Sequence, residues 1–151
     1  DKLMVNPKSI HAYILGEHGD SEVPLWSTAT VGNTPLDRFQ KISELEKNKI
    51  FNQAKNAAYA IIEGKQATYY AIAAGISKLV KAVLFDKKTV YAVSHPLEGN
   101  YGLNGVCLSL PAVIGAKGVI KKINLPMTAR EKRLFLKSAA KLMKAEESLL
   151  K

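Results

Sequence analysis

Cysteine and arginine are scarce in this sequence. One cysteine cannot form an internal disulfide, which fits a reducing compartment, and the neighbours of Cys107 predict a small buried side chain within a strand. Lysine and arginine number 22 against 13 acidic residues, a net charge of +9, but only Arg38, Arg130 and Arg133 are arginines. The excess favours anionic partners in general. With so few bidentate guanidinium groups, it gives little support for nucleic-acid binding.

Long apolar runs and closely spaced glycines are also missing. No segment reaches the roughly 20 apolar residues that a membrane-spanning helix needs. Nowhere are two glycines separated by one residue, so neither a Rossmann fingerprint nor a P-loop is present. We therefore expect that this chain alone does not hold a dinucleotide. His11, His18 and His95 lack the spacing and the neighbouring ligands of a metal site, so we expect no bound metal.

The length of 151 residues and the hydrophobic content of 47% predict one domain with one sizeable core. Alternating apolar residues predict strands, and residues with a spacing of three to four predict helices. The expected strands cover residues 10–15, 25–31, 89–94, 106–114 and 119–123, the last three as an antiparallel meander. Runs of strands beside runs of helices predict a single α+β domain over residues 1–151.

Two capping boxes mark expected helix starts. Ser43 with Glu46 begins a helix that should end near Gly64, and Thr128 with Glu131 begins a helix that runs to the C-terminus. Between them, the alanine-rich segment 67–85 is apolar nearly all round. That pattern predicts a central helix buried on most sides.

His18 lies in the expected polar loop after the first strand, between Gly16 and Gly19. A loop histidine can exchange protons near neutral pH, but an arbitrary loop histidine is more often a surface or capping residue. Asp20 and Ser21 suggest a Ser-His-Asp hydrolase, yet the loop lacks the nucleophile elbow and its glycine spacing. The residue pattern alone leaves the role of His18 open.

Three ordered motifs together resemble the L-lactate dehydrogenases of bacterial type, within the lactate/malate dehydrogenase family. They are residues 16–21 (GEHGDS) with 24–27 (PLWS), residues 59–72 (YAIIEGKQATYYAI) and residues 106–111 (VCLSLP). The match is to the family's C-terminal, substrate-binding domain. It implies an α+β fold of antiparallel strands packed against long helices.

The resemblance implies roles for four residues. His18 matches the proton donor and acceptor that acts on the carbonyl oxygen of pyruvate while hydride arrives from NADH. Thr68 matches the threonine beside the substrate, and Ile72 the apolar residue against the nicotinamide ring, although a packing role for Ile72 stays open. His11 occupies the place of a histidine that meets a phosphate of the allosteric effector fructose 1,6-bisphosphate in some members; a solvated surface histidine is the alternative.

The family's N-terminal NAD-binding Rossmann domain is absent from this chain. The arginine that binds the substrate carboxylate, the aspartate that orients the histidine and the mobile-loop arginine all precede Asp1 in the family pattern, and Asp1 itself is no initiator methionine. We therefore expect a piece of a longer protein, inactive in isolation. Residues 115–118 also depart from the family's usual arginine-asparagine pair, in an expected surface turn.

The resemblance places the parent enzyme in the cytoplasm, as a homotetramer that reduces pyruvate to L-lactate in glycolysis and pyruvate fermentation. Two alternatives stay open at this point. One is a dehydrogenase of a bulkier 2-hydroxy acid, because the specificity loop lies upstream. The other is a non-catalytic oligomerisation or anion-binding module.

Overall fold

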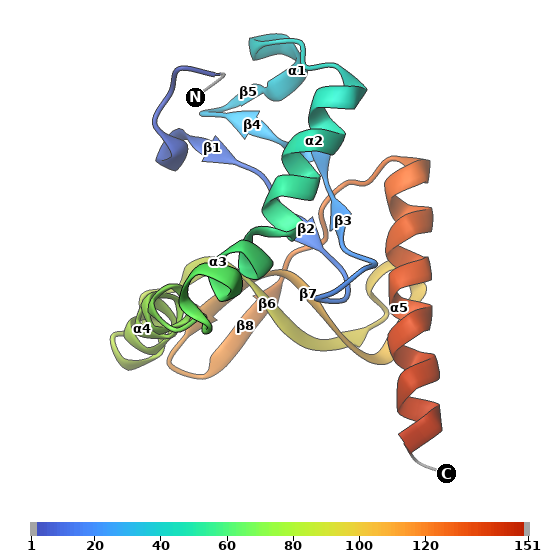
Figure 1. The fold of residues 1–151 in the computed structure, drawn as a ribbon. Coiled ribbons are helices and arrows are strands. Elements are labelled where there is room, and N and C mark those ends of the chain that lie inside the picture. The colour runs from blue at the N-terminus through green and yellow to red at the C-terminus, as the bar shows by residue number, and fades with distance from the viewer. Residues whose placement is uncertain (1–2, 150–151) are drawn as a thin grey trace.

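The computed structural model of the chain describes residues 3–149. Short strands fill the first part of the chain, and long helices with a three-stranded sheet make up the rest (Figure 1). In chain order the elements are the 3-10 helix η1 (Pro7–Ser9), β1 (Ile10–His11), β2 (Ile14–Leu15), β3 (Val23–Pro24), η2 (Trp26–Thr28), β4 (Thr30–Val31), β5 (Thr34–Pro35), α1 (Leu36–Phe39), α2 (Glu44–Lys55), α3 (Ala57–Lys65), α4 (Tyr70–Leu84), β6 (Thr89–Glu98), η3 (Asn100–Gly102), β7 (Asn104–Gly115), β8 (Gly118–Lys122) and α5 (Ala129–Leu149).

The strand pairs of the described residues are all antiparallel and form three sheets. The sheet orders are β1-β4-β5, β2-β3 and β6-β7-β8, and the last is the predicted meander. A bridge between Gly16 and Ser109 connects the end of β2 to β7. Antiparallel strands beside long helices confirm the predicted α+β class.

The main core lies where α5 packs against the β2-β3 hairpin and β7. Phe135 of α5 is fully buried, and its ring meets that of Tyr101 edge-on, with 5.2 Å between the ring centroids. Such a tilted aromatic pair is favourable beyond the area it buries. The buried members of this cluster are Leu15, Val23, Leu25, Leu97, Val106, Leu108, Leu110, Phe135 and Ala139. The turn after β2 is therefore built directly onto the core.

Both predicted capping boxes are confirmed. Ser43 Oγ accepts from the Glu46 backbone N–H at the start of α2, and the Glu46 carboxylate accepts in return. At the start of α5, Thr128 Oγ1 accepts from the Glu131 N–H, and the Glu131 carboxylate accepts from the Thr128 N–H at 2.8 Å. These reciprocal bonds satisfy backbone donors that a helix start leaves unpaired.

The two strands predicted near the start of the chain are wrong in extent. The segment 10–15 is interrupted after two residues, because β1 pairs with β4 while β2 pairs with β3. The segment 25–31 contains the 3-10 turn Trp26–Thr28 instead of a continuous strand. There Ser27 donates hydrogen bonds to Glu131 of α5 from its backbone N–H and its hydroxyl, at 3.1 and 2.6 Å. A tertiary contact therefore outweighs local strand propensity.

The helix predicted over residues 43–64 is two helices. α2 ends at Lys55, and α3 starts at Ala57 after Asn56, whose backbone angles are non-helical. The second helix ends at Lys65, one residue past Gly64, and the capping residue Gln66 after it adopts a left-handed conformation with φ of 59°. A left-handed residue is a common helix terminator, although glycine is its usual occupant.

The prediction that the alanine-rich helix is buried on most sides is wrong for this chain. α4 forms as expected, but Ala82 is its one buried residue. Its apolar side chains Ile72, Ile76, Val80 and Leu84 face solvent because no described element covers them. Among residues 3–149, no helix combines the length and the apolar composition that crossing a bilayer requires.

The burial predicted for Cys107 is also wrong. Its neighbours Val106 and Leu108 are buried, but Cys107 is exposed. Side chains alternate between the two faces of a strand, so inward neighbours place this thiol on the outer face of β7. The strand predicted over residues 89–94 is longer than expected, because β6 continues to Glu98.

Replacing Glu131 by glutamine should destabilise the fold in a pH-dependent way. Burial alone raises the pKa of the Glu131 carboxyl, but hydrogen bonds from Ser27 and Thr128 outweigh it and hold the pKa below its ordinary value of 4.5. Hydrogen bonds to a charged group contribute about 2 kcal/mol, so Glu131→Gln should lower the free energy of unfolding by roughly that amount at pH 7.

Because the folded-state pKa is depressed, this stability is present above pH 4.5 and is lost as the pH falls through the lowered value. Urea unfolding of both proteins at several pH values measures the effect. A difference between them that stays constant from neutral pH down to acid would contradict the assignment.

Candidate active site

His18 lies on the turn that joins β2 to β3. Gly16 begins this turn with φ of +94°, a conformation that side chains with a Cβ rarely adopt. The side chain of His18 is 98% exposed, so molecules in solution can reach its ring. The predicted loop placement of His18 is confirmed.

One carboxylate contacts the His18 ring. Nδ1 of His18 lies 2.9 Å from Oε1 of Glu22, whose side chain is 13% exposed. An ionised carboxylate only accepts hydrogen bonds, so Nδ1 is the donor in this pair. Nε2 is then the ring nitrogen that can exchange a proton with a bound molecule. Glu22 was not predicted as a partner of His18, because its spacing of four residues was the one signal available in the sequence.

Asp20 and Ser21 do not complete a hydrolase triad with His18. The hydroxyl of Ser21 donates to a neighbouring carboxylate and lies 3.2 Å from the hydroxyl of Ser138. Asp20 Oδ1 lies 3.3 Å from Nζ of Lys55. A serine nucleophile must hydrogen-bond to the histidine that activates it, so this arrangement does not support acyl transfer.

Two helices hold the turn in place. From α5, Ser138 Oγ accepts a hydrogen bond from the Glu17 backbone N–H at 2.8 Å, and Lys141 Nζ donates to the Glu17 carboxylate at 3.0 Å. From the end of α2, Lys55 Nζ donates to the backbone oxygen of Asp20 at 3.1 Å. Residues on both sides of His18 are therefore anchored to helices.

Thr68 and Ile72 come from a different part of the fold. Thr68 lies between α3 and α4, half-buried, and lines a cavity of about 400 Å³ together with Tyr69 and Tyr70. Ile72 is exposed in the first turn of α4. Within residues 3–149, no hydrogen bond or ion pair connects either residue to His18.

His11 is separate from the turn as well. It lies on β1, opposite Thr30 of β4, with its side chain exposed. In the described part of the chain its ring makes no hydrogen bond and no ion pair. An exposed ring without partners is free to meet an anion from outside.

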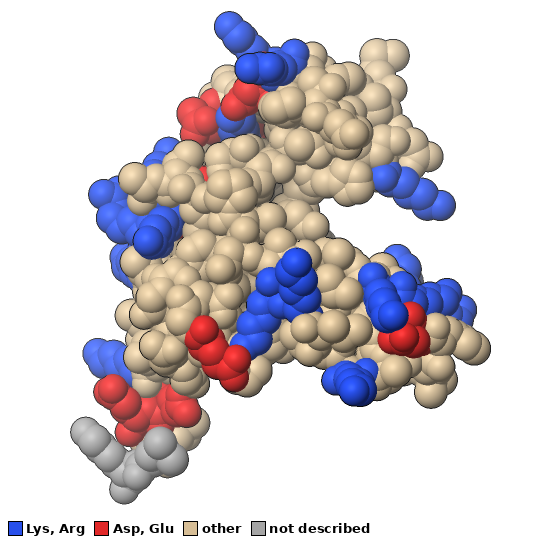
Figure 2. Space-filling model, turned by 180° about the vertical axis from the view of Figure 1, so that it is seen from behind, with Lys and Arg blue, Asp and Glu red and all other residues tan. Residues whose placement is uncertain are grey.

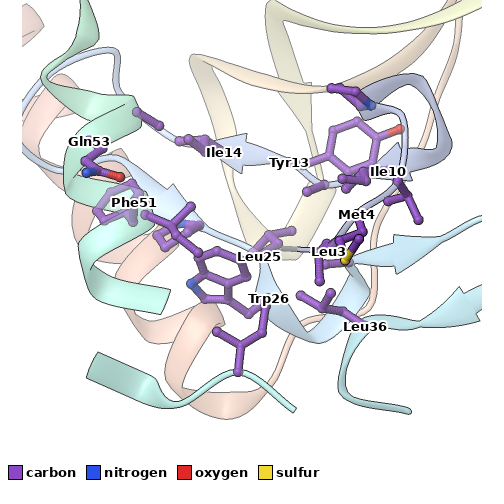
Figure 3. A pocket seen from close by; sticks show the side chains of 18 residues that line it. Leu3, Met4, Ile10, Tyr13, Ile14, Leu25, Trp26, Leu36, Phe51 and Gln53 are labelled. Carbon is purple, nitrogen blue, oxygen red and sulfur yellow. The ribbon is translucent and has the colours of Figure 1, made fainter. Parts of the chain in front are cut away.

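An apolar cavity of about 610 Å³ lies beside the candidate site and does not include His18. Figure 3 shows Phe51 and Gln53 of α2 on one side of it, with Trp26 near its centre. Ile14 and Pro24, which pair across the β2-β3 hairpin, also line it. The cavity shares the hairpin with His18 but offers almost no polar groups for chemistry.

Basic side chains outnumber acidic ones on the face shown in Figure 2, which is hollowed between the upper and lower parts of the molecule. This distribution agrees with the net charge of +9. A positive surface raises the local concentration of small anions.

Several residues of the site could not be read from the sequence. Glu17 meets Ser138 across 121 residues and Lys141 across 124, and Ser27 meets Glu131 across 104. No local pattern links positions so far apart. Glutamate, serine and lysine are ordinary at solvated positions, so these residues are identified only by the contacts they make in the fold.

Comparison with known proteins shows relatives along the whole chain. L-lactate dehydrogenase of Acetivibrio thermocellus is 40% identical over 99% of this chain and 49% of its own length. L-lactate dehydrogenase 2 of Lactococcus lactis subsp. lactis is 43% identical over 98% of the chain and 48% of its own length. The chain therefore spans about half the length of the curated relatives it matches.

Comparison with solved structures also shows lactate and malate dehydrogenases as relatives. A ligand-bound crystal structure of minor L-lactate dehydrogenase from Enterococcus mundtii is 40% identical, with a TM-score of 0.91 over 97% of this chain and 48% of that one. Malate dehydrogenase from Aeropyrum pernix is 35% identical, with a TM-score of 0.86 over 95% of this chain and 47% of that one. The family described as lactate/malate dehydrogenase, alpha/beta C-terminal domain, matches residues 1–151, and the chain therefore belongs to that family.

Proposed function

We propose that this chain is the proton-transferring, substrate-binding half of an NAD-dependent L-lactate dehydrogenase, with His18 as the general acid and base. The observation that carries the proposal is an exposed histidine whose Nδ1 is held by Glu22 at 2.9 Å. Relatives named L-lactate dehydrogenase, 40% and 43% identical, support the reaction class. The net charge of +9 suits an anionic substrate such as pyruvate.

The contact with Glu22 supports Nε2 as the ring nitrogen that transfers the proton. In the direction of lactate formation, protonated His18 donates its Nε2 hydrogen to the carbonyl oxygen of pyruvate. In this chain Glu22 is the partner of Nδ1, whereas the resemblance places the aspartate that orients the ring in the parent enzyme outside the chain. In the reverse direction, Nε2 accepts the hydroxyl proton of lactate. The nicotinamide cofactor, when bound, supplies or accepts the hydride.

Thr68 and Ile72, near the start of α4, are the further residues to which we give roles in binding substrate and cofactor. Thr68 is half-buried, and its hydroxyl would contact the carboxylate end of the substrate. Ile72 is apolar and exposed, so it offers a surface for the flat nicotinamide ring. The further apolar side chains exposed on α4 suit an assembled parent enzyme, which we propose to be a cytoplasmic homotetramer.

The described residues do not fit a complete NAD site. A dinucleotide is normally held at the glycine-rich turn of a βαβ unit with parallel strands, and every strand pair in residues 3–149 is antiparallel. The arrangement of strands thus agrees with the missing glycine spacing. We infer that the cofactor is held mainly by residues outside this chain.

The purified chain alone should not oxidise NADH with pyruvate. The same chain fused behind the N-terminal half of Lactococcus lactis L-lactate dehydrogenase 2 should do so, because that half lies outside the match with this chain. The loss of NADH absorbance measures both, with the full-length Lactococcus enzyme as the positive control. Turnover by the chain alone, or a folded fusion that does not oxidise NADH with pyruvate, would contradict the proposal.

In that fusion, His18→Gln should lower kcat by about 10²- to 10⁴-fold, the usual contribution of a general acid and base. Glutamine keeps polarity and reach but cannot exchange the proton. The KM for NADH should stay unchanged, and Lys144→Met on the outer part of α5 serves as the surface control. A His18→Gln fusion with undiminished kcat would remove the catalytic assignment.

Fructose 1,6-bisphosphate should lower the KM for pyruvate in the fusion, and His11→Gln should reduce that response. The exposed ring of His11 has no described partner, so a protonated ring is available to a phosphate. Steady-state kinetics with and without the effector measure the change. If both fusions respond equally to the effector, His11 takes no part in the response.

A further inference from the structure

The hydroxyl of Ser138 is buried at the centre of the contact between α5 and the turn that carries His18. Ser138 has no exposed surface, and its Oγ accepts from the Glu17 backbone N–H at 2.8 Å and lies 3.2 Å from Ser21 Oγ. Leaving a buried polar group unpaired is costly, so both partners are constrained by this one hydroxyl. The constraint acts on the residue before His18 and on the residue three positions after it.

The backbone at Gly16 is shaped to admit this hydroxyl. A Cβ added at Gly16 would lie 2.6 Å from Ser138 Oγ, closer than real Cβ contacts allow. The positive φ of +94° at Gly16 independently favours glycine. α5 can therefore approach the turn closely because Gly16 has no side chain and Ser138 has a small polar one.

A second contact with α5 fixes the Glu17 side chain. The Glu17 carboxylate accepts from the Ser21 hydroxyl and, at 3.0 Å, from Lys141 Nζ. These two hydrogen bonds, that from Ser21 foremost, lower the pKa of the Glu17 carboxyl below its ordinary value. The turn also bends closely around this carboxylate, because a Cβ at Gly19 would lie 2.8 Å from Glu17 Oε1.

The His18 ring itself has little support. Its side chain is 98% exposed, and among the described residues its one hydrogen-bond partner is Glu22. The position of the ring must therefore follow the backbone on either side of it, which α5 anchors. A misplacement of about 1 Å can reduce an enzyme's rate by about 10²-fold, so a turn of this kind needs such anchors.

We propose that Ser138 and Lys141 of α5 are positioning residues for His18, acting through Glu17 and Ser21. The proposal rests on the proposed function of His18. Neither residue touches substrate: Ser138 sets the backbone path of the turn, and Lys141 locks the Glu17 carboxylate on which the turn is folded.

The first experiment uses the chain as it is and needs no activity. Hydrogen exchange measured by NMR should show the Glu17 amide exchanging about 10-fold faster in Ser138→Ala, because its acceptor is removed. The ring signals of His18 should shift or broaden in Ser138→Ala and in Lys141→Met. Amides of β8, which pairs with β7 and has no hydrogen bond or ion pair with α5 among the described residues, should keep their wild-type exchange.

The second experiment measures kcat in the fusion with the Lactococcus half. Ser138→Ala and Lys141→Met should each lower kcat about 10-fold and leave the KM for NADH unchanged, because orientation of His18 affects the chemical step. Lys141→Arg should restore most of the rate by keeping the charge. Lys144→Met is the matched control, since Lys144 has no hydrogen bond or ion pair in the described residues.

Lys141 is half-exposed, so its variants test the idea even if Ser138→Ala fails to fold. Unchanged His18 signals, or an equal kcat in Lys141→Met and Lys144→Met, would overturn the proposal while leaving His18→Gln as the test of function. If His18→Gln leaves kcat of the fusion unchanged, both the proposed function and the positioning role are overturned. This holds whatever hydrogen exchange shows about the contact between Ser138 and Glu17.

Discussion

The contact between α5 and the β2-β3 hairpin is the interaction on which the candidate site depends. Its centre is apolar, with Phe135 fully buried, but polar groups stand on both sides of that centre. Glu131 meets Ser27 toward the start of the helix, and Ser138 meets Glu17 one turn after the phenylalanine. Apolar packing alone tolerates small shifts, whereas paired buried polar groups do not. The two polar contacts thus fix the register of α5 against the hairpin and the 3-10 turn that follows it.

Local signals in the sequence were sufficient for the helices that begin with a capping box and for the meander. In each case the information lies within a few residues: a serine or threonine three positions before a glutamate, or alternation along a strand. The 3-10 turn at Trp26–Thr28 was missed because its shape depends on Glu131, which lies 104 residues from Ser27. Asn56 interrupts the predicted helix, and no glycine or proline marks that position as a break.

The errors on burial have a different cause. An alanine-rich helix and a thiol between two apolar neighbours both have compositions typical of cores. The composition of α4 is apolar on all sides, but this chain supplies a neighbour for one side only, so Ile72 and Ile76 stay exposed. For Cys107 the period of the strand decided the outcome, because its two neighbours already occupy the inner face.

The residues of the candidate site also fall into those that a sequence motif marks and those that only the fold brings together. His18 could be singled out because a motif surrounds it, and resemblance gave Thr68, Ile72 and His11 their expected roles. Glu22 is four residues away and could have been proposed as a partner, but many loops place a carboxylate at that distance. Ser138 and Lys141 carry no signal of their own, since a serine and a lysine in a charged amphipathic helix are ordinary. Their importance follows from the three-dimensional contact alone.

The outward-facing thiol of Cys107 has a consequence for how this chain behaves under air. It is the one cysteine of the sequence, and it lies on the opposite face of β7 from the residues that pack against α5. A chain with one cysteine can form only one intermolecular disulfide. Disulfide formation through Cys107 can therefore join at most two chains.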